Sequence, residues 1–347
     1  MAKPPPPLTY RDSGVDLADA GAVVRAVAPL ARRTANEHCI GGVGCFGGLF
    51  QLPADIGPQP VLVAGADGVG TKLQLAAAAG RNGDVGVDLV AMCVNDILAH
   101  GARPLFFLDY YASGRLRAEA VAEVVAGICR GCEQAGCALL GGESAAMPGL
   151  YRDGDYDLAG FAVGAVNRAD LIDGGGIGAG DAVIGIAGSG PHANGFSLVR
   201  AVLKRSGVSL SATVGGATLA DALLAPTKIY VRPVLRLLTQ TTVKGIAHIT
   251  GGGIAGNLSR ILPPGAAARV DASAWARPAV FTWLKDAGGI GEEEMLRTFN
   301  CGIGMALVVD AAEADGVVKF LRGAGEEAFC IGKVTAAVGG EQRVVIA

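Results

Sequence analysis

Apolar and polar residues along the chain follow two periods, one typical of helices and one typical of strands. Apolar positions recur at helical spacing near the start of the chain, for example at Val23, Val27 and Leu30. The same spacing predicts helices over 15–33, 88–100, 117–135, 195–206, 227–238 and 312–322. Short apolar or alternating segments predict strands over 60–64, 105–111, 137–140, 156–166, 182–187, 246–250, 302–309 and 330–334. Because strands and helices are mixed in both halves, the pattern predicts an α/β or α+β fold.

A glycine-rich segment, 173–180, interrupts this pattern near the middle of the chain. A chain of 347 residues favours two domains at about 150 residues each. We place the boundary within 168–180, which predicts an N-terminal domain over 1–170 and a C-terminal domain over 171–347.

Composition narrows the classes of protein. Gly accounts for 54 of 347 residues, about twice its usual share, and its clusters suggest loops where backbone approaches a ligand. The net charge of -3, without a basic block, gives no support for a nucleic-acid partner. We find neither a long uninterrupted apolar stretch nor a secretory signal, so we expect no membrane span and a cytoplasmic location. The eight cysteines, including the C-x-x-C pair Cys129 and Cys132, are then expected to be free thiols, and that pair to be buried in a helix.

Residues 65–72 form the segment with the clearest chemistry. Their sequence nearly matches the P-loop G-x-x-x-x-G-K-[ST], but the order of its last two residues is reversed. The reversal argues against an ordinary P-loop. The segment still offers an acid, Asp67, to hold Mg²⁺, and a cation, Lys72, to meet a phosphate. It also carries Gly68, Gly70 and Thr71 beside them. The alternative is a strand–turn–helix junction with a surface lysine.

A second glycine-rich loop spans 41–48 and contains a formal G-x-G-x-x-G at Gly42, Gly44 and Gly47. A dinucleotide-binding fingerprint needs a preceding strand, and the residues before this loop are polar. The loop is better explained as a flexible cover over phosphates.

Two further acids are candidate magnesium ligands. Asp96, preceded by Asn95, interrupts a long apolar run, and a buried carboxylate needs a partner. That partner is a metal or, alternatively, an arginine or a helix N-terminus. Glu143 follows a short strand and two glycines. Asp67, Asp96 and Glu143 would converge as hard oxygen ligands, although spacing alone does not place them together.

Two of the four histidines lie in promising contexts. His192 precedes Asn194 in a polar loop that enters a helix, and His248 lies just before Thr250 and three glycines. Each histidine would bind substrate or transfer a proton, and the alternative for each is a structural hydrogen bond.

Taken together, these segments resemble the aminoimidazole ribonucleotide synthetases, also called phosphoribosylformylglycinamidine cyclo-ligases. The resemblance covers nearly the whole chain, in order. The matching segments are 10–16, 67–72, 92–96, 106–111, 141–149, 157–161, 190–200, 224–230, 249–253 and 299–302. Residues 96–104 also match the D-x4-G-A-x-P pattern of the wider ATP-binding superfamily.

The resemblance implies an N-terminal α/β domain whose strands pair across a homodimer to form a barrel, and a C-terminal α/β domain. It implies that formylglycinamidine ribonucleotide and ATP are converted into aminoimidazole ribonucleotide, ADP and phosphate, with Mg²⁺. In the family, the substrate's amide oxygen attacks the γ-phosphate, and an internal nitrogen then closes the imidazole ring. This reaction belongs to purine biosynthesis and needs positioning and charge neutralisation more than covalent catalysis.

The resemblance also implies roles for individual residues. The three acids would hold the metal with help from Asn95, the glycine loops and Thr71 would bind the nucleotide, and Lys72 would neutralise phosphate charge. His192 and Asn194 would contact the ribonucleotide, while His248 and Thr250 would lie near the domain junction. Lys72, His192 and His248 are therefore the expected catalytic residues.

The sequence departs from the family at three positions and leaves two rival functions open. Ala146 and Gly256 stand where the family has glutamate, and Ala193 stands where it has serine. None of these positions is a proposed metal ligand. One rival is another enzyme of the same superfamily that acts on a different amide, on selenide or on thiamin phosphate. The other rival is a non-catalytic nucleotide-binding protein.

Overall fold

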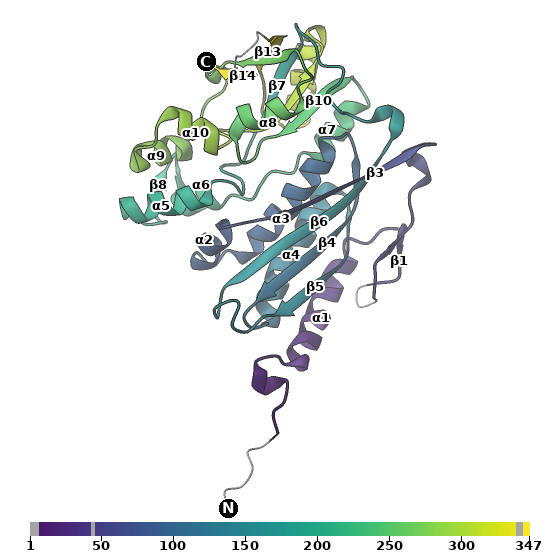
Figure 1. The fold of residues 1–347 in the computed structure, drawn as a ribbon, viewed down its shortest axis with the longest axis vertical. Helices are drawn as coiled ribbons and strands as arrows, with labels where there is room; N and C mark the ends of the chain where they lie inside the picture. Colours follow the sequence, from purple (N-terminus) through teal and green to yellow (C-terminus); the bar gives the residue numbers. More distant parts are fainter. Residues whose placement is uncertain (1–6, 43–45, 338–342) are drawn as a thin grey trace, which may run out of the picture.

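A computed structural model of the chain describes residues 7–42, 46–337 and 343–347. Its N-terminal region, up to residue 170, is built on a four-stranded sheet with the order β3-β6-β4-β5 (Figure 1). The sheet strands are β3 (Pro60–Gly68), β4 (Arg103–Ser113), β5 (Ala138–Ala146) and β6 (Tyr156–Asn167). β4 and β5 are parallel and the other neighbours antiparallel, so the sheet is mixed.

Three long helices belong to this region: α1 (Leu17–Arg32), α3 (Asn82–Leu98) and α4 (Ala118–Ala135). α3 and α4 pack together against one face of the sheet, and α1 packs on α4 and β5. A Cβ atom on Gly127 would lie 1.9 Å from the carbonyl oxygen of Gly83, so glycine is required where α3 and α4 meet. Cys129 and Cys132 are buried free thiols within α4, which confirms that expectation.

The C-terminal region contains a six-stranded sheet with the order β10-β12-β7-β13-β11-β14. Its strands are β7 (Ala182–Ala187), β10 (Val243–His248), β11 (Ala266–Val270), β12 (Ile303–Val309), β13 (Ala328–Ala336) and β14 (Val344–Ile346). Its helices are α5 (Phe196–Ser206), α6 (Leu219–Leu224), α7 (Val231–Leu238), α8 (Gly253–Ile261), α9 (Ala279–Gly288), α10 (Glu292–Thr298) and α11 (Ala314–Gly323).

Short elements complete the described chain. They are the hairpins β1 (Cys39–Ile40) with β2 (Leu49–Phe50) and β8 (Thr213–Val214) with β9 (Ala217–Thr218), the helix α2 (Lys72–Ala78), and five 3-10 turns: η1 (Arg11–Ser13), η2 (Ala54–Ile56), η3 (Arg168–Asp170), η4 (Ala272–Ala274) and η5 (Ala311–Glu313). Within the described residues, no helix is long and apolar enough to cross a bilayer.

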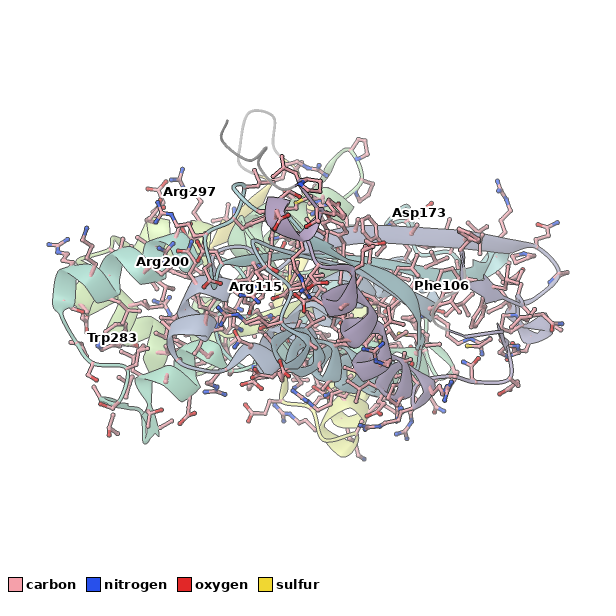
Figure 2. The ribbon with its side chains drawn as sticks, turned by 90° about the horizontal axis from the view of Figure 1, so that it is seen from below. Phe106, Arg115, Asp173, Arg200, Trp283 and Arg297 are labelled. Carbon is pink, nitrogen blue, oxygen red and sulfur yellow. The ribbon has the colours of Figure 1, made fainter. Side chains whose placement is uncertain are left out.

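One apolar core runs through both regions. It joins Val94 and Leu98 of α3 to Ile184 of β7 and Leu321 of α11. A second core fills the other face of the C-terminal sheet, beneath α8. Seen end-on, Arg200 of α5 and Trp283 of α9 lie toward one end of the molecule and Phe106 of β4 toward the other (Figure 2).

The predicted α/β fold class is confirmed. Many element boundaries differ from the prediction, and three of these differences bear on the candidate site. The strand predicted over 60–64 continues to Gly68, so Asp67 lies in a strand and Lys72 begins a helix. α3 begins at Asn82, six residues before the predicted start, because the glycines that allow close packing on α4 weakened the helical pattern. α7 begins at Val231 because residues 225–230 instead form a segment without helical structure that hydrogen-bonds to α3.

Candidate functional site

The predicted acids Asp67 and Asp96 lie close together where β3 faces α3. A Cβ on Gly65, two residues before Asp67 on the same face of β3, would lie 3.9 Å from Cβ of Asp96. Asp67 accepts a hydrogen bond of 2.7 Å from the backbone N–H of Gly68. Partial burial and then the nearby Asp96 carboxylate raise the pKa of Asp67. The two carboxylates therefore form a site that a cation would stabilise.

His248, at the end of β10, connects this pair to the C-terminal region. Its Nδ1 lies 2.8 Å from Oδ1 of Asp96, whose side chain is 52% exposed. Both residues line a cavity of about 370 Å³ between the two regions, together with Ala66, Asn257 and Arg260. Asp96 and His248, 152 residues apart in the sequence, thus converge on one cavity.

Asn95 and Thr250 lie beside this cluster, but their side chains already form hydrogen bonds with other residues of the protein. Asn95 is buried, its Oδ1 accepts from the N–H of Tyr230 at 3.1 Å, and its Nδ2 donates to the carbonyl of Lys228 at 2.9 Å. The Oγ1 of Thr250 is 3.3 Å from Oδ1 of Asn257. Asn95 therefore holds the segment before α7, which explains why an amide interrupts the apolar run.

Glu143 lies apart from the other two acids. Register places Asp67, Gly160, Asp109 and Gly142 in one row across the sheet, on the face that α3 covers. Glu143 follows Gly142, so its side chain points to the opposite face. Three strand spacings of about 4.8 Å also separate β5 from β3. Among the described residues, no group of three or more acids, histidines or cysteines is placed to hold a metal.

A second cavity, of about 550 Å³, lies beside Glu143. It is lined by Gly42 and Gly47 of the glycine-rich loop, by apolar residues of α1, and by Asp109. Gly44 lies outside the described residues. Burial, and secondarily the charge of Glu143, raise the pKa of Asp109 to about 7. Sequence reasoning missed Asp109, although an acid within an aromatic strand segment was a visible signal.

The turn after β3 positions two of the predicted nucleotide contacts. Gly70 has φ 66°, a conformation that favours glycine, and it leads into α2. Thr71 lies at the N-terminal end of α2, with Oγ1 3.3 Å from Oγ of Ser197 in α5. A Cβ on Gly68 would lie 3.0 Å from the carbonyl oxygen of Leu158, so this strand end is tightly packed.

Lys72 is not on the surface, as the alternative interpretation required. Its side chain is fully buried, and Nζ is 2.9 Å from both carboxylate oxygens of Asp88 in α3. It also donates to the carbonyls of His192 at 2.8 Å and Ala225 at 3.0 Å. Three acceptor groups occupy its three N–H donors, so this geometry does not favour the predicted phosphate contact.

His192 is also buried. Its Nε2 accepts from the N–H of Ser189 at 3.2 Å, and its Nδ1 has no partner among the described residues. Burial, and then the charge of His248, lower the pKa of His192 well below its usual value. Nδ2 of Asn194 lies 3.9 Å from Sδ of Met92 in α3, a weak contact. The structural alternative fits the His192 ring better than direct substrate contact does.

The departures from the family pattern do not disturb this geometry. A Cβ on Gly256 would meet nothing within 4 Å, so a larger side chain has room there. Ala193 packs against the apolar core, and Ala146 ends β5 away from the Asp96 cluster.

Family models account for both regions. One for the N-terminal domain of AIR synthase related proteins matches residues 48–166, and one for the C-terminal domain matches residues 178–345. The chain belongs to this family and has its two domains.

Similar proteins carry a more specific name. The phosphoribosylformylglycinamidine cyclo-ligases of Burkholderia vietnamiensis and Burkholderia multivorans are each 53% identical to the chain over 339 residues, 98% of this chain and 96% of theirs. The Burkholderia pseudomallei enzyme of the same name is 54% identical over the same share.

Solved structures share the fold at lower identity. A thiamine-monophosphate kinase from Stenotrophomonas maltophilia superposes with a TM-score of 0.70 at 20% identity, covering 94% of this chain and 95% of the kinase. The hydrogenase maturation protein HypE in complex with ATP has a TM-score of 0.64 at 18% identity, covering 91% of this chain and 88% of HypE. These likenesses establish the fold alone.

Proposed function

We propose that this protein catalyses the ATP-dependent closure of formylglycinamidine ribonucleotide to aminoimidazole ribonucleotide, with release of ADP and phosphate. The observation that carries the proposal is the identity of 53–54% to proteins named for this reaction, over nearly the full length of both chains. The cavity between the domains, with Asp96 and His248 in its wall, supports a site for such a substrate.

Asp67 and Asp96 are the proposed magnesium ligands. Their oxygen atoms suit Mg²⁺, and within the described chain the Asp67 carboxylate receives only the Gly68 N–H. Bound Mg²⁺ supplies positive charge that offsets the negative charge of the ATP phosphates. His248 orients the Asp96 carboxylate through Nδ1. The proposed nucleotide-binding residues are Gly68, Gly70 and Thr71.

We further propose that the active protein is a homodimer in which Glu143 completes the site of the other copy. The uncovered face of the N-terminal sheet carries Leu62, which is 63% exposed, and Phe161, which is 46% exposed. A second copy packed on this face would bury them. Glu143 of the second copy points to this face as well, so to reach Asp67 and Asp96 of the first copy it has to pass the β3 edge of the first sheet.

The activity is tested with purified protein, ATP, Mg²⁺ and formylglycinamidine ribonucleotide. We expect equal amounts of ADP and ring-closed product by mass spectrometry, and a large loss of both for Asp96→Asn. Folded parent protein that makes no ring-closed product would contradict the proposal. ADP release with thiamin monophosphate in its place would favour a kinase of the same fold.

The shared site is tested by mixing two inactive variants, Asp96→Asn and Glu143→Gln, after unfolding and refolding them together. If the acids come from different copies, each mixed dimer has one intact site, and activity recovers to about a quarter of the parent value for a symmetric dimer. If all three acids act within one chain, every site stays defective and no activity returns. Each variant refolded alone is the control.

A further inference from the structure

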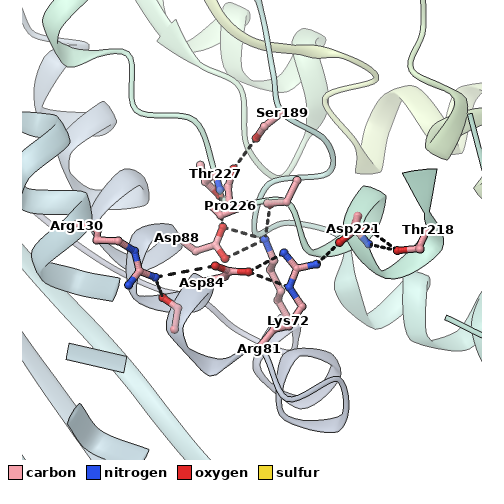
Figure 3. Close-up of polar contacts among 12 residues, drawn as sticks. Lys72, Arg81, Asp84, Asp88, Arg130, Ser189, Thr218, Asp221, Pro226 and Thr227 are labelled. Carbon is pink, nitrogen blue, oxygen red and sulfur yellow. Dashed lines mark hydrogen bonds and ion pairs between the residues drawn. The ribbon is translucent and has the colours of Figure 1, made fainter. Parts of the chain in front are cut away.

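A buried cluster at the domain boundary is not explained by the proposed chemistry. Lys72 and Asp88, both from the N-terminal domain, are fully buried and paired at 2.9 Å (Figure 3). Their remaining hydrogen bonds all go to the C-terminal domain. Lys72 donates to the carbonyls of His192 and Ala225, and Oδ1 of Asp88 accepts from the N–H and Oγ1 of Thr227 at 2.7 Å and 2.6 Å.

The cluster fixes two separate C-terminal segments at once. The contact at His192 holds residues 189–195, and the contacts at Ala225 and Thr227 hold residues 225–230. Ser189 also donates from Oγ to the carbonyl of Pro226 at 2.6 Å, so the two segments brace each other. A shift of either segment would leave a buried charge without its hydrogen-bond partners, which is costly in free energy. The arrangement is therefore rigid.

The segment 189–195 is the one that the proposed reaction needs in place. His192 has a φ of 62°, unusual for a residue other than glycine, and its carbonyl points to Lys72. This backbone leads directly to Asn194 and to Gly195, the residue before α5. The Lys72 contact therefore fixes the direction in which the Asn194 side chain leaves the loop.

We propose that Lys72 and Asp88 form an interdomain latch that positions the segment 189–195 for the ribonucleotide, and that Lys72 is a positioning residue. This inference rests on the proposed function only in naming the ribonucleotide as the substrate. The latch itself follows from a buried ion pair whose hydrogen bonds to other residues all reach across the boundary.

A weaker contact at the same boundary provides a matched control. Arg81 donates from Nη1 to Oδ1 of Asp221 at 2.9 Å, and Asp221 is 60% exposed (Figure 3). It joins the same two domains without touching segments 189–195 or 225–230. Arg81→Ala thus removes an interdomain charge pair and leaves the latch intact.

The test compares Lys72→Met with the double variant Lys72→Met/Asp88→Asn, which leaves no unpaired charge and keeps the chain foldable. With the double variant we expect the KM for the ribonucleotide to rise at least tenfold, with the KM for ATP changing less than threefold. A tenfold rise in the KM for ATP would show that Lys72 contacts phosphate and would overturn the latch. Unchanged KM values for both substrates would overturn it as well.

A second readout is independent of activity. Hydrogen–deuterium exchange should be faster at residues 189–195 and 225–230 in the double variant than in the parent or in Arg81→Ala. Parent protein that closes no ring would refute the proposed function and leave this measurement valid. Unchanged exchange at both segments would refute the latch even in an active enzyme.

Discussion

The pair of Lys72 and Asp88 and the pair of Asp96 and His248 both lie at the domain boundary, and they differ in what surrounds them. Lys72 and Asp88 are sealed from solvent with every donor of the lysine in use, whereas Asp96 is half exposed beside His248 on an open cavity. The buried pair keeps its present partners, because neither water nor a ligand reaches it. The open pair can accept a new partner. Buried charged residues at the boundary therefore hold the domains together, whereas exposed ones are available to a ligand. In the sequence, both kinds are simply charged residues near glycines.

The largest expected effect on stability comes from breaking the sealed pair. Asp88→Ala leaves the Lys72 ammonium buried without a counter-ion, which costs about 3–5 kcal/mol of unfolding free energy. Urea unfolding followed by circular dichroism measures the change. A loss below about 1 kcal/mol would show that water reaches the lysine and would remove the contrast between the two pairs.

Breaking the open pair should affect activity more than stability. Asp96→Asn keeps the shape and removes the charge proposed to hold Mg²⁺, so we expect kcat/KM to fall at least 100-fold, about 2.7 kcal/mol. Because this carboxylate is half exposed, unfolding free energy should change by less than about 1 kcal/mol. An enzyme with near-normal kcat/KM would exclude Asp96 as a metal ligand.

Asp109 sharpens the comparison, because it is also buried and forms no ion pair with any residue that the structure describes. Its pKa is raised to about 7, so folding favours its protonated form. Its contribution to stability is complete below about pH 4 and is lost as pH rises to 7, with a total on the order of a few kcal/mol. In Asp109→Asn, the decrease of unfolding free energy between pH 4 and 7 should be smaller than in the parent. An identical pH profile in both proteins would contradict the raised pKa.

The smallest effect is expected at the rim of the boundary. Arg81→Ala removes a partly exposed contact to Asp84 and a contact to the exposed Asp221, and should lower the free energy of unfolding by less than about 1 kcal/mol. The loss should shrink further at high salt, since exposed charges are screened. A salt-independent loss of several kcal/mol would mean that this pair, too, is shielded from solvent.

The sequence predicted the main strands and helices because apolar periodicity follows from local geometry. It also singled out Asp67, Asp96 and His248, two of which meet at 2.8 Å. It did not predict the burial of Lys72, whose partners lie 16, 120 and 153 residues away. Nor did it place Glu143, because which face a strand residue occupies depends on register with neighbouring strands. Both the burial of Lys72 and the face occupied by Glu143 depend on packing between segments that are distant in the sequence.

The helix α3 has a consequence for how the protein can be divided. From Val85 to Leu98 every residue except Asp96 is buried, and the core around it includes strands and helices of both domains. A fragment ending near residue 170 would therefore leave one side of α3 facing water, and we expect it to aggregate when expressed alone. The two family domains share one apolar core, so we expect them to unfold together.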